Sequence, residues 1–258
     1  MTDDFLANYP NAENFIPGIY NYCDRWCERC PFSDRCLNYA REKRRWGDNP
    51  PRDIQDPEFW DAFNEVMEET LALLTRITEE LGIDPDDVDE EALAEDEQRF
   101  EEAWQHSLMQ AATDYGKMVD QWFDAAEGDF QDKEETLNML ARVNAPGVDP
   151  EAEARALIDA VEVIRWYQFF IAAKVHRALM GLDDPDDGFP KDGDGSAKIA
   201  LIATERSMAA WERLLYAFPA REMETLRILA HLQRLRDQTD TLFPNARAFI
   251  RPGFDELP

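Results

Sequence analysis

Apolar residues recur at three- and four-residue spacing over four long stretches of this chain, the spacing that places side chains on one face of an α-helix. The stretches cover residues 56–82, 100–123, 151–180 and 196–218. No stretch bounded by turn residues alternates apolar and polar side chains as a half-buried strand does, and no segment repeats another. The pattern therefore predicts an all-α protein, a multi-helix bundle of four long helices plus shorter ones.

The first and third stretches carry matching start and stop signals. An Asp-Pro pair opens each one, at Asp56 and Asp149, and a glycine follows each one, at Gly82 and Gly181. Proline fits the first turn of a helix, whereas glycine adopts the left-handed conformation that often ends one. Residues 161–179 are apolar on nearly all sides, so we expect the third helix to be the most buried.

The other helix boundaries depend on weaker signals. The second long helix is expected to end near Phe123, with a shorter helix over residues 134–143. Residues 183–195 are rich in Gly, Asp and Pro, which predicts a loop. Asp194 or Ser196 is then expected to cap the fourth long helix, because short polar side chains accept hydrogen bonds from the first backbone N–H groups.

All four cysteines lie within fourteen residues, in the pattern C-x3-C-x2-C-x5-C. Soft thiolates select zinc or iron–sulfur clusters, and four of them complete the coordination of either. The N-terminus lacks the charged and apolar regions of a secretory signal, so a reducing cytoplasm is the expected compartment. The alternatives are a disulfide pair, redox-sensing thiols or ordinary core cysteines. The preferred prediction is a metal centre with four ligands: Cys23, Cys27, Cys30 and Cys36.

The spacing of the cysteines also predicts how their segment folds. The first three lie at i, i+4 and i+7, which on a helix places three sulfurs on one face, and Pro31 would end that helix. Ser33 or Asp34 can cap a second helix, with Cys36 in its first turn. That helix is expected to end at Trp46. The result would be a small N-terminal helical hairpin.

A break rich in Gly and Pro follows this hairpin at residues 47–51. It predicts two parts of the chain. Residues 1–50 would form an N-terminal arm and the four-cysteine metal-binding hairpin, and residues 51–258 would form the body of the helical bundle.

The identity of the metal is left open between two candidates. Zinc sites commonly pair two distant C-x2-C turns, whereas here one C-x2-C lies in a single compact run, which favours a [4Fe-4S] cluster. Tyr22, Trp26 and Phe32 could shield such a cluster. Charged residues between the cysteines, such as Asp24 and Arg25, favour a structural zinc. We favour the cluster, and with it an electron-transfer, redox-sensing or accessory function.

The first three cysteines also share the C-x3-C-x2-C spacing of radical S-adenosylmethionine enzymes. Those enzymes use a β/α barrel and leave one iron without a cysteine ligand. A chain without predicted strands, in which Cys36 can supply a fourth ligand, does not fit that family.

Charge limits the partners of the protein. The chain has 55 acidic and 27 basic residues, a formal net charge of −28, which disfavours a broad nucleic-acid-binding surface. The most apolar segment, residues 156–182, is interrupted by too many charges to span a membrane. If the metal is zinc, the protein could instead be an interaction module that docks a protein partner on a basic strip. The strip consists of Arg41, Lys43, Arg44 and Arg45.

A second candidate site lies in the helical body, where charged residues interrupt the most apolar helices. They would form either a structural network or the polar lining of a cofactor or substrate pocket, as in a helical-bundle enzyme. A di-iron carboxylate centre is not predicted, because the chain lacks the Glu-x-x-His pairs that build one. The candidate pocket residues are Glu162, Arg165, His176 and Glu205.

Overall fold

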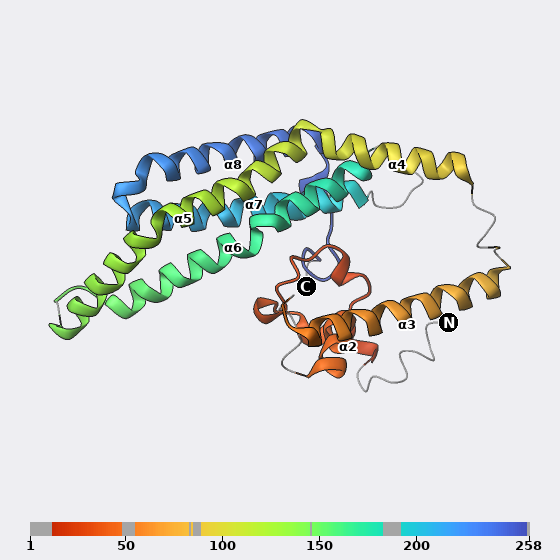
Figure 1. The fold of residues 1–258 in the computed structure, drawn as a ribbon, viewed down its shortest axis with the longest axis horizontal. Helices are drawn as coiled ribbons and strands as arrows, with labels where there is room; N and C mark the ends of the chain where they lie inside the picture. The colour runs from red at the N-terminus through yellow and green to blue at the C-terminus, as the bar shows by residue number, and fades with distance from the viewer. Residues whose placement is uncertain are drawn as a thin grey trace. The chain divides into compact units, whose positions relative to one another are not determined.

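The computed structural model describes residues 12–47, 55–82, 84, 89–144, 146–182 and 192–256. Within these ranges the chain forms seven α-helices, α2 to α8, together with short 3-10 helices, and no strand (Figure 1). The prediction of an all-α multi-helix protein is confirmed. None of the described helices combines the length and the apolar character that crossing a bilayer requires.

The chain divides into two compact units. Unit 1 comprises residues 1–98 together with the C-terminal residues 252–258, and unit 2 comprises Arg99–Arg251. The predicted boundary between residues 50 and 51 lies outside the described residues. The C-terminal end of the chain therefore belongs to the same unit as the cysteines, which the sequence did not predict.

Unit 1 contains α2 (Leu37–Trp46) and α3 (Pro57–Leu81), and α4 (Glu90–Gln105) continues from it into unit 2. The ends of α3 are those predicted. The Asp56 carboxylate accepts a hydrogen bond from the N–H of Glu58 at 3.0 Å, and Gly82 ends the helix with a φ of 67°. Helix α3 buries none of its side chains within the described structure, although one face is strongly apolar.

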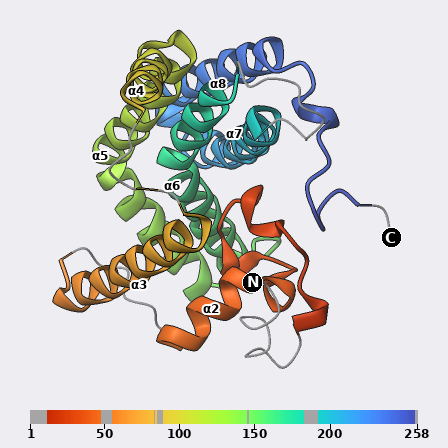
Figure 2. The same ribbon diagram turned by 90° about the vertical axis from the view of Figure 1, so that its right-hand side faces the viewer.

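Unit 2 is built from four long helices that lie alongside one another (Figures 1 and 2). They are α5 (Ser107–Arg142), α6 (Pro150–Met180), α7 (Asp192–Ala217) and α8 (Glu222–Leu242). Each contributes an apolar stripe to a common core, as expected for helices that bury one face. Fully buried core side chains include Tyr115, Val119, Ile164, Tyr167, Ile171, Trp211, Leu214 and Leu232.

The second predicted helix, residues 100–123, is interrupted near its start in the structure and continues beyond its predicted end. It is interrupted at His106, which has a ψ of 138° and caps α5 by accepting a hydrogen bond from the N–H of Leu108 on Nδ1 at 3.1 Å. Helix α5 then continues through Phe123 and Gly128 and includes the predicted shorter helix. An interior glycine weakens a helix by only about 1 kcal/mol, which the packing of a long amphipathic helix offsets.

Helix α7 begins earlier than predicted, so residues 192–195 are helical rather than part of a loop. Gly193 permits this start, because a Cβ atom there would lie 2.8 Å from the carbonyl oxygen of Gly181. Ser196 is buried in the helix instead of capping it. Helix α7 is also buried more extensively than α6. On α6, Ile158 is 59% exposed and Phe169 is 65% exposed. The prediction that α6 is the most buried helix is therefore wrong.

Candidate metal centre

The cysteine segment is not a helical hairpin with three sulfurs on one helical face. Arg25 has a φ of 58°, a left-handed conformation that interrupts any helix between Cys23 and Cys27. Two short 3-10 helices follow, Cys27–Arg29 and Ser33–Arg35. Each makes a tight turn that ends at a cysteine, because Cys30 donates its N–H to Cys27 at 3.2 Å and Cys36 donates its N–H to Ser33 at 3.1 Å.

Cys36 lies directly before α2, at the N-cap position, with an extended backbone (φ −110°, ψ 116°). The predicted caps Ser33 and Asp34 belong instead to the preceding 3-10 helix. The end of α2 at Trp46 is as predicted. Consecutive tight turns, rather than a continuous helix, therefore set the directions of the last three cysteines.

The folded segment nevertheless brings all four cysteines to one small cavity in unit 1. Its volume is about 20 Å³, enough for about one water molecule. Cys36 is buried, and the other three cysteines are half-buried. The remaining walls come mostly from apolar and aromatic side chains, including Ile19, Tyr20, Trp26, Tyr39 and Phe254.

Local hydrogen bonds and burial control the chemistry of the thiols. The N–H of Phe32 donates to the sulfur of Cys30 at 3.4 Å, a contact that stabilises a thiolate. Burial, and after it the nearby charges of Glu42 and the other cysteines, raises the pKa of Cys27 to about 12. Burial likewise raises the pKa of Cys23 and of Cys30. Metal binding would therefore displace protons from these thiols.

The four residues fit a thiophilic metal by the chemistry and number of their donors. Among the described residues, however, no three His, Cys, Asp or Glu side chains are arranged as a ready coordination sphere. The four cysteines line one cavity but are not grouped as metal ligands within the described residues.

The predicted basic strip lies along α2 in the same unit. Arg41, Lys43 and Arg44 are exposed, whereas Arg45 is half-buried and forms an ion pair with Glu69 of α3. Arg41, Arg44 and Arg45 line an open groove of about 910 Å³ between α2 and α3. The groove also contains carboxylates, so its charge is mixed. Its acidic residues are Glu42, Glu65 and Glu69.

The second candidate site is distributed over separate contacts in unit 2. Arg165 is exposed on α6, where its guanidinium donates hydrogen bonds to the Asp120 carboxylate at 2.7 Å and to the Gln168 side-chain oxygen at 3.0 Å. Hydrogen bonds with Gln168 and Arg165 lower the pKa of Asp120. Glu162, one helical turn before Arg165, is also exposed. The pocket assignment of these residues stays a prediction.

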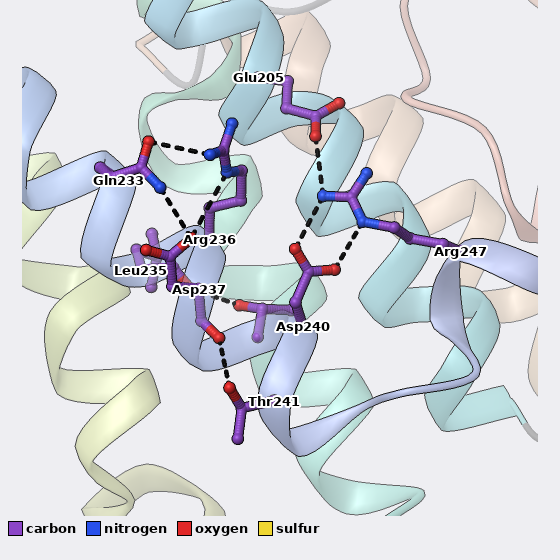
Figure 3. Close-up of polar contacts among 9 residues, drawn as sticks. Glu205, Gln233, Leu235, Arg236, Asp237, Asp240, Thr241 and Arg247 are labelled. Carbon is purple, nitrogen blue, oxygen red and sulfur yellow. Dashed lines mark hydrogen bonds and ion pairs between the residues drawn. The ribbon is translucent and has the colours of Figure 1, made fainter.

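Glu205 has a different partner, Arg247, which donates to it at 2.9 Å (Figure 3). The same guanidinium donates two hydrogen bonds to Asp240, at 2.7 and 2.8 Å. These hydrogen bonds to Asp240 and Glu205 raise the pKa of Arg247. Arg247 thus joins α7, α8 and the segment that follows α8.

The three histidines have distinct environments. His106 caps α5, and His231 contacts the carbonyl oxygen of Ala111 through Nε2 at 2.7 Å, so neither side chain is simply solvated. The ring of His176 packs against Phe100 and Trp104, with centroids 4.8 and 5.1 Å away. Its buried Nε2 has no hydrogen-bond partner within the described structure.

Comparison of the chain with models of known protein families, with curated proteins and with solved structures gives no match.

Proposed function

We propose that unit 1 is a metal-binding module in which Cys23, Cys27, Cys30 and Cys36 hold a [4Fe-4S] cluster. The function that follows is electron transfer or redox sensing, because a cluster with four thiolate ligands leaves no iron open for substrate. The observation that carries the proposal is the shared cavity: four thiols from fourteen residues line it together.

The surroundings of the thiols support this proposal. Ile19 is buried beside the cysteines, and aromatic rings form much of the remaining wall. Burial and N–H to sulfur hydrogen bonds are two of the means by which a protein sets the reduction potential of a cluster. The hydrogen bond from Phe32 to Cys30 is one such contact.

Anaerobic purification tests the proposal. Protein carrying a cluster should be brown, with about four iron atoms and four sulfides per chain. Cys27→Ser should remove the iron, whereas Ser33→Ala should retain it, because Ser33 lines the same cavity without supplying a soft ligand. A colourless protein without iron, or full iron content in Cys27→Ser, would contradict the assignment.

The second candidate is a structural zinc ion in a protein-interaction module. The small volume of the cavity favours it, because about 20 Å³ accommodates a single ion more readily than a cluster of eight atoms. The groove beside α2 would then receive an acidic segment of a partner through Arg41 and Arg44. One zinc per chain in colourless protein would select this alternative.

A further inference from the structure

We propose that the C-terminal tail, residues 252–256, closes the four-cysteine cavity and limits the access of solvent, chelators and oxidants to its sulfurs. This inference rests on the proposed metal-binding function, because it assigns a shielding role at the same site. The centre would then be complete only when residues 252–256 are in place beside the cysteine segment.

Phe254 is the residue through which the tail reaches the cavity. Its side chain lines the cavity together with the four cysteines. It also packs edge-to-face on Phe32, with centroids 5.1 Å apart and an angle of 85° between the rings. The N–H of Phe32 donates to the sulfur of Cys30, so the tail supports a residue that contacts a proposed ligand.

Gly253 shows how closely the tail packs on the N-terminal segment. Its φ is 75°, and a Cβ atom added there would lie 2.8 Å from Cδ1 of Ile16 and 3.1 Å from Cδ1 of Ile19. Ile19 is 2% exposed and is itself a wall of the cavity. The N–H of Ile16 donates to the carbonyl of Arg35, the residue before Cys36, at 3.0 Å. The tail therefore packs on the same backbone that positions the cysteines.

The chain leading to the tail is held within unit 2. Lys198 of α7 donates to the carbonyl oxygens of Phe249 at 2.6 Å and Arg247 at 3.3 Å. The Arg247 side chain is fixed in turn by Asp240 and Glu205 (Figure 3). These contacts order the backbone up to Phe249, three residues before the tail begins, which lowers the entropy lost when the tail docks.

The position of Phe254 at the cavity has a chemical consequence. Alkylating agents, oxidants and chelators must reach a sulfur or its metal, and exposure decides how fast they do so. Cys23, Cys27 and Cys30 are only half-buried even with Phe254 in place. Removal of the ring should therefore expose these three sulfurs further.

Two tail variants and one matched control test the inference in the full-length chain. Phe254→Ala removes the ring, and Gly253→Ala places a Cβ 2.8 Å from Cδ1 of Ile16, so that the tail or the Ile16 side chain must shift. Gly147→Ala is the control, because Gly147 also has a positive φ (79°) but no atom within 4 Å of an added Cβ. The first measurement is the rate at which iodoacetamide modifies each cysteine of the metal-free protein, followed by mass spectrometry. The second is the rate at which a chelator removes the bound metal.

We expect both tail variants to be alkylated at least about threefold faster at Cys23, Cys27 and Cys30, and to lose metal faster, while Gly147→Ala behaves as the wild type. Wild-type alkylation rates in folded tail variants, or an equal increase in Gly147→Ala, would overturn the inference. Faster alkylation in a protein that never binds metal would support the tail as a wall of the cavity and refute the metal-binding function separately.

Discussion

At the scale of single residues, the core of unit 2 contains a buried pair of aromatic polar groups. The Trp211 indole N–H donates to the hydroxyl of Tyr115 at 3.1 Å, and both side chains are fully buried. Burial raises the pKa of Tyr115 to about 12, because the phenolate would lose its hydration. The protonated form of Tyr115 is therefore part of the folded core.

This raised pKa predicts a loss of stability in alkali. Above pH 10 the unfolded chain releases the Tyr115 proton while the folded protein retains it, so the free energy of unfolding falls as the pH rises towards 12. The contribution lost over this range is about 2–3 kcal/mol. Tyr115→Phe should lower stability at neutral pH but show a shallower decline above pH 10. Denaturant unfolding of both proteins from pH 8 to 12 measures the difference, and identical slopes would contradict the prediction.

His176 offers a second test at this scale. Its buried Nε2 has no hydrogen-bond partner within the described structure, whereas Gln168 donates to the carbonyl of Gly116 at 2.9 Å and accepts from Arg165. An unsatisfied buried polar group costs stability, and its removal is nearly neutral or favourable. We expect His176→Leu to leave the free energy of unfolding unchanged or raised by up to about 1 kcal/mol, and Gln168→Leu to lower it by about 1–3 kcal/mol. Urea unfolding checks both values, and strong destabilisation by His176→Leu would contradict the prediction.

At the scale of elements, the leucines of α3 and α8 differ in how far they are buried. Leu71 of α3 is 57% exposed, whereas Leu232 of α8 is fully buried. Leu71→Ala should change the free energy of unfolding by no more than about 0.5 kcal/mol, because little apolar area is uncovered and alanine favours the helix. Leu232→Ala should cost about 2–5 kcal/mol, because it leaves a cavity. Unfolding curves followed by circular dichroism give both values, and a cost above about 2 kcal/mol for Leu71→Ala would show that the apolar face of α3 is covered.

The helices that sequence predicts best are those whose ends are encoded locally. The boundaries of α3 and α6 lie where Asp-Pro pairs and terminal glycines predict them, and the Asp149 carboxylate accepts from the N–H of Ala152 at 2.9 Å as a cap should. Gly181 nevertheless ends α6 with a φ of −95° rather than in the predicted left-handed conformation. The break at His106 and the start of α7 at Asp192 are not predictable in this way. The first depends on an unusual imidazole cap, and the second depends on close packing of Gly193 against Gly181.

At the scale of the whole molecule, the candidate site is only partly predictable, because some of its features are encoded locally in the sequence and others depend on distant parts of the chain. The four cysteines and their shared location follow from sequence spacing, because residues so close in the chain cannot lie far apart. Their turns do not follow, since the spacing fits a helix equally well and Arg25 adopts a left-handed conformation instead. Phe254 lies more than two hundred residues away in the chain, and no local pattern indicates that it reaches the cavity.

The two units should also differ in what stabilises them. Unit 2 has an extensive apolar core, whereas in the described part of unit 1 only Ile19 and Cys36 are buried. A bound metal would stabilise unit 1 by mass action and would add nothing to a core it does not contact. We therefore predict that the Cys30→Ser variant does not bind the metal and that its backbone amides around residues 12–47 lose protection from hydrogen exchange. The amides of α5 to α8 should keep their protection.

Hydrogen exchange read by mass spectrometry resolves these regions in one experiment, with circular dichroism to report total helix. Addition of a chelator to the wild type should reproduce the pattern, since it removes the metal without changing a side chain. Exposed amides without a stable backbone hydrogen bond exchange fast, whereas core amides exchange only when the whole unit opens. The exchange rates of the two units should therefore differ strongly. Loss of protection throughout unit 2 in Cys30→Ser would mean that the metal centre is needed for the whole fold.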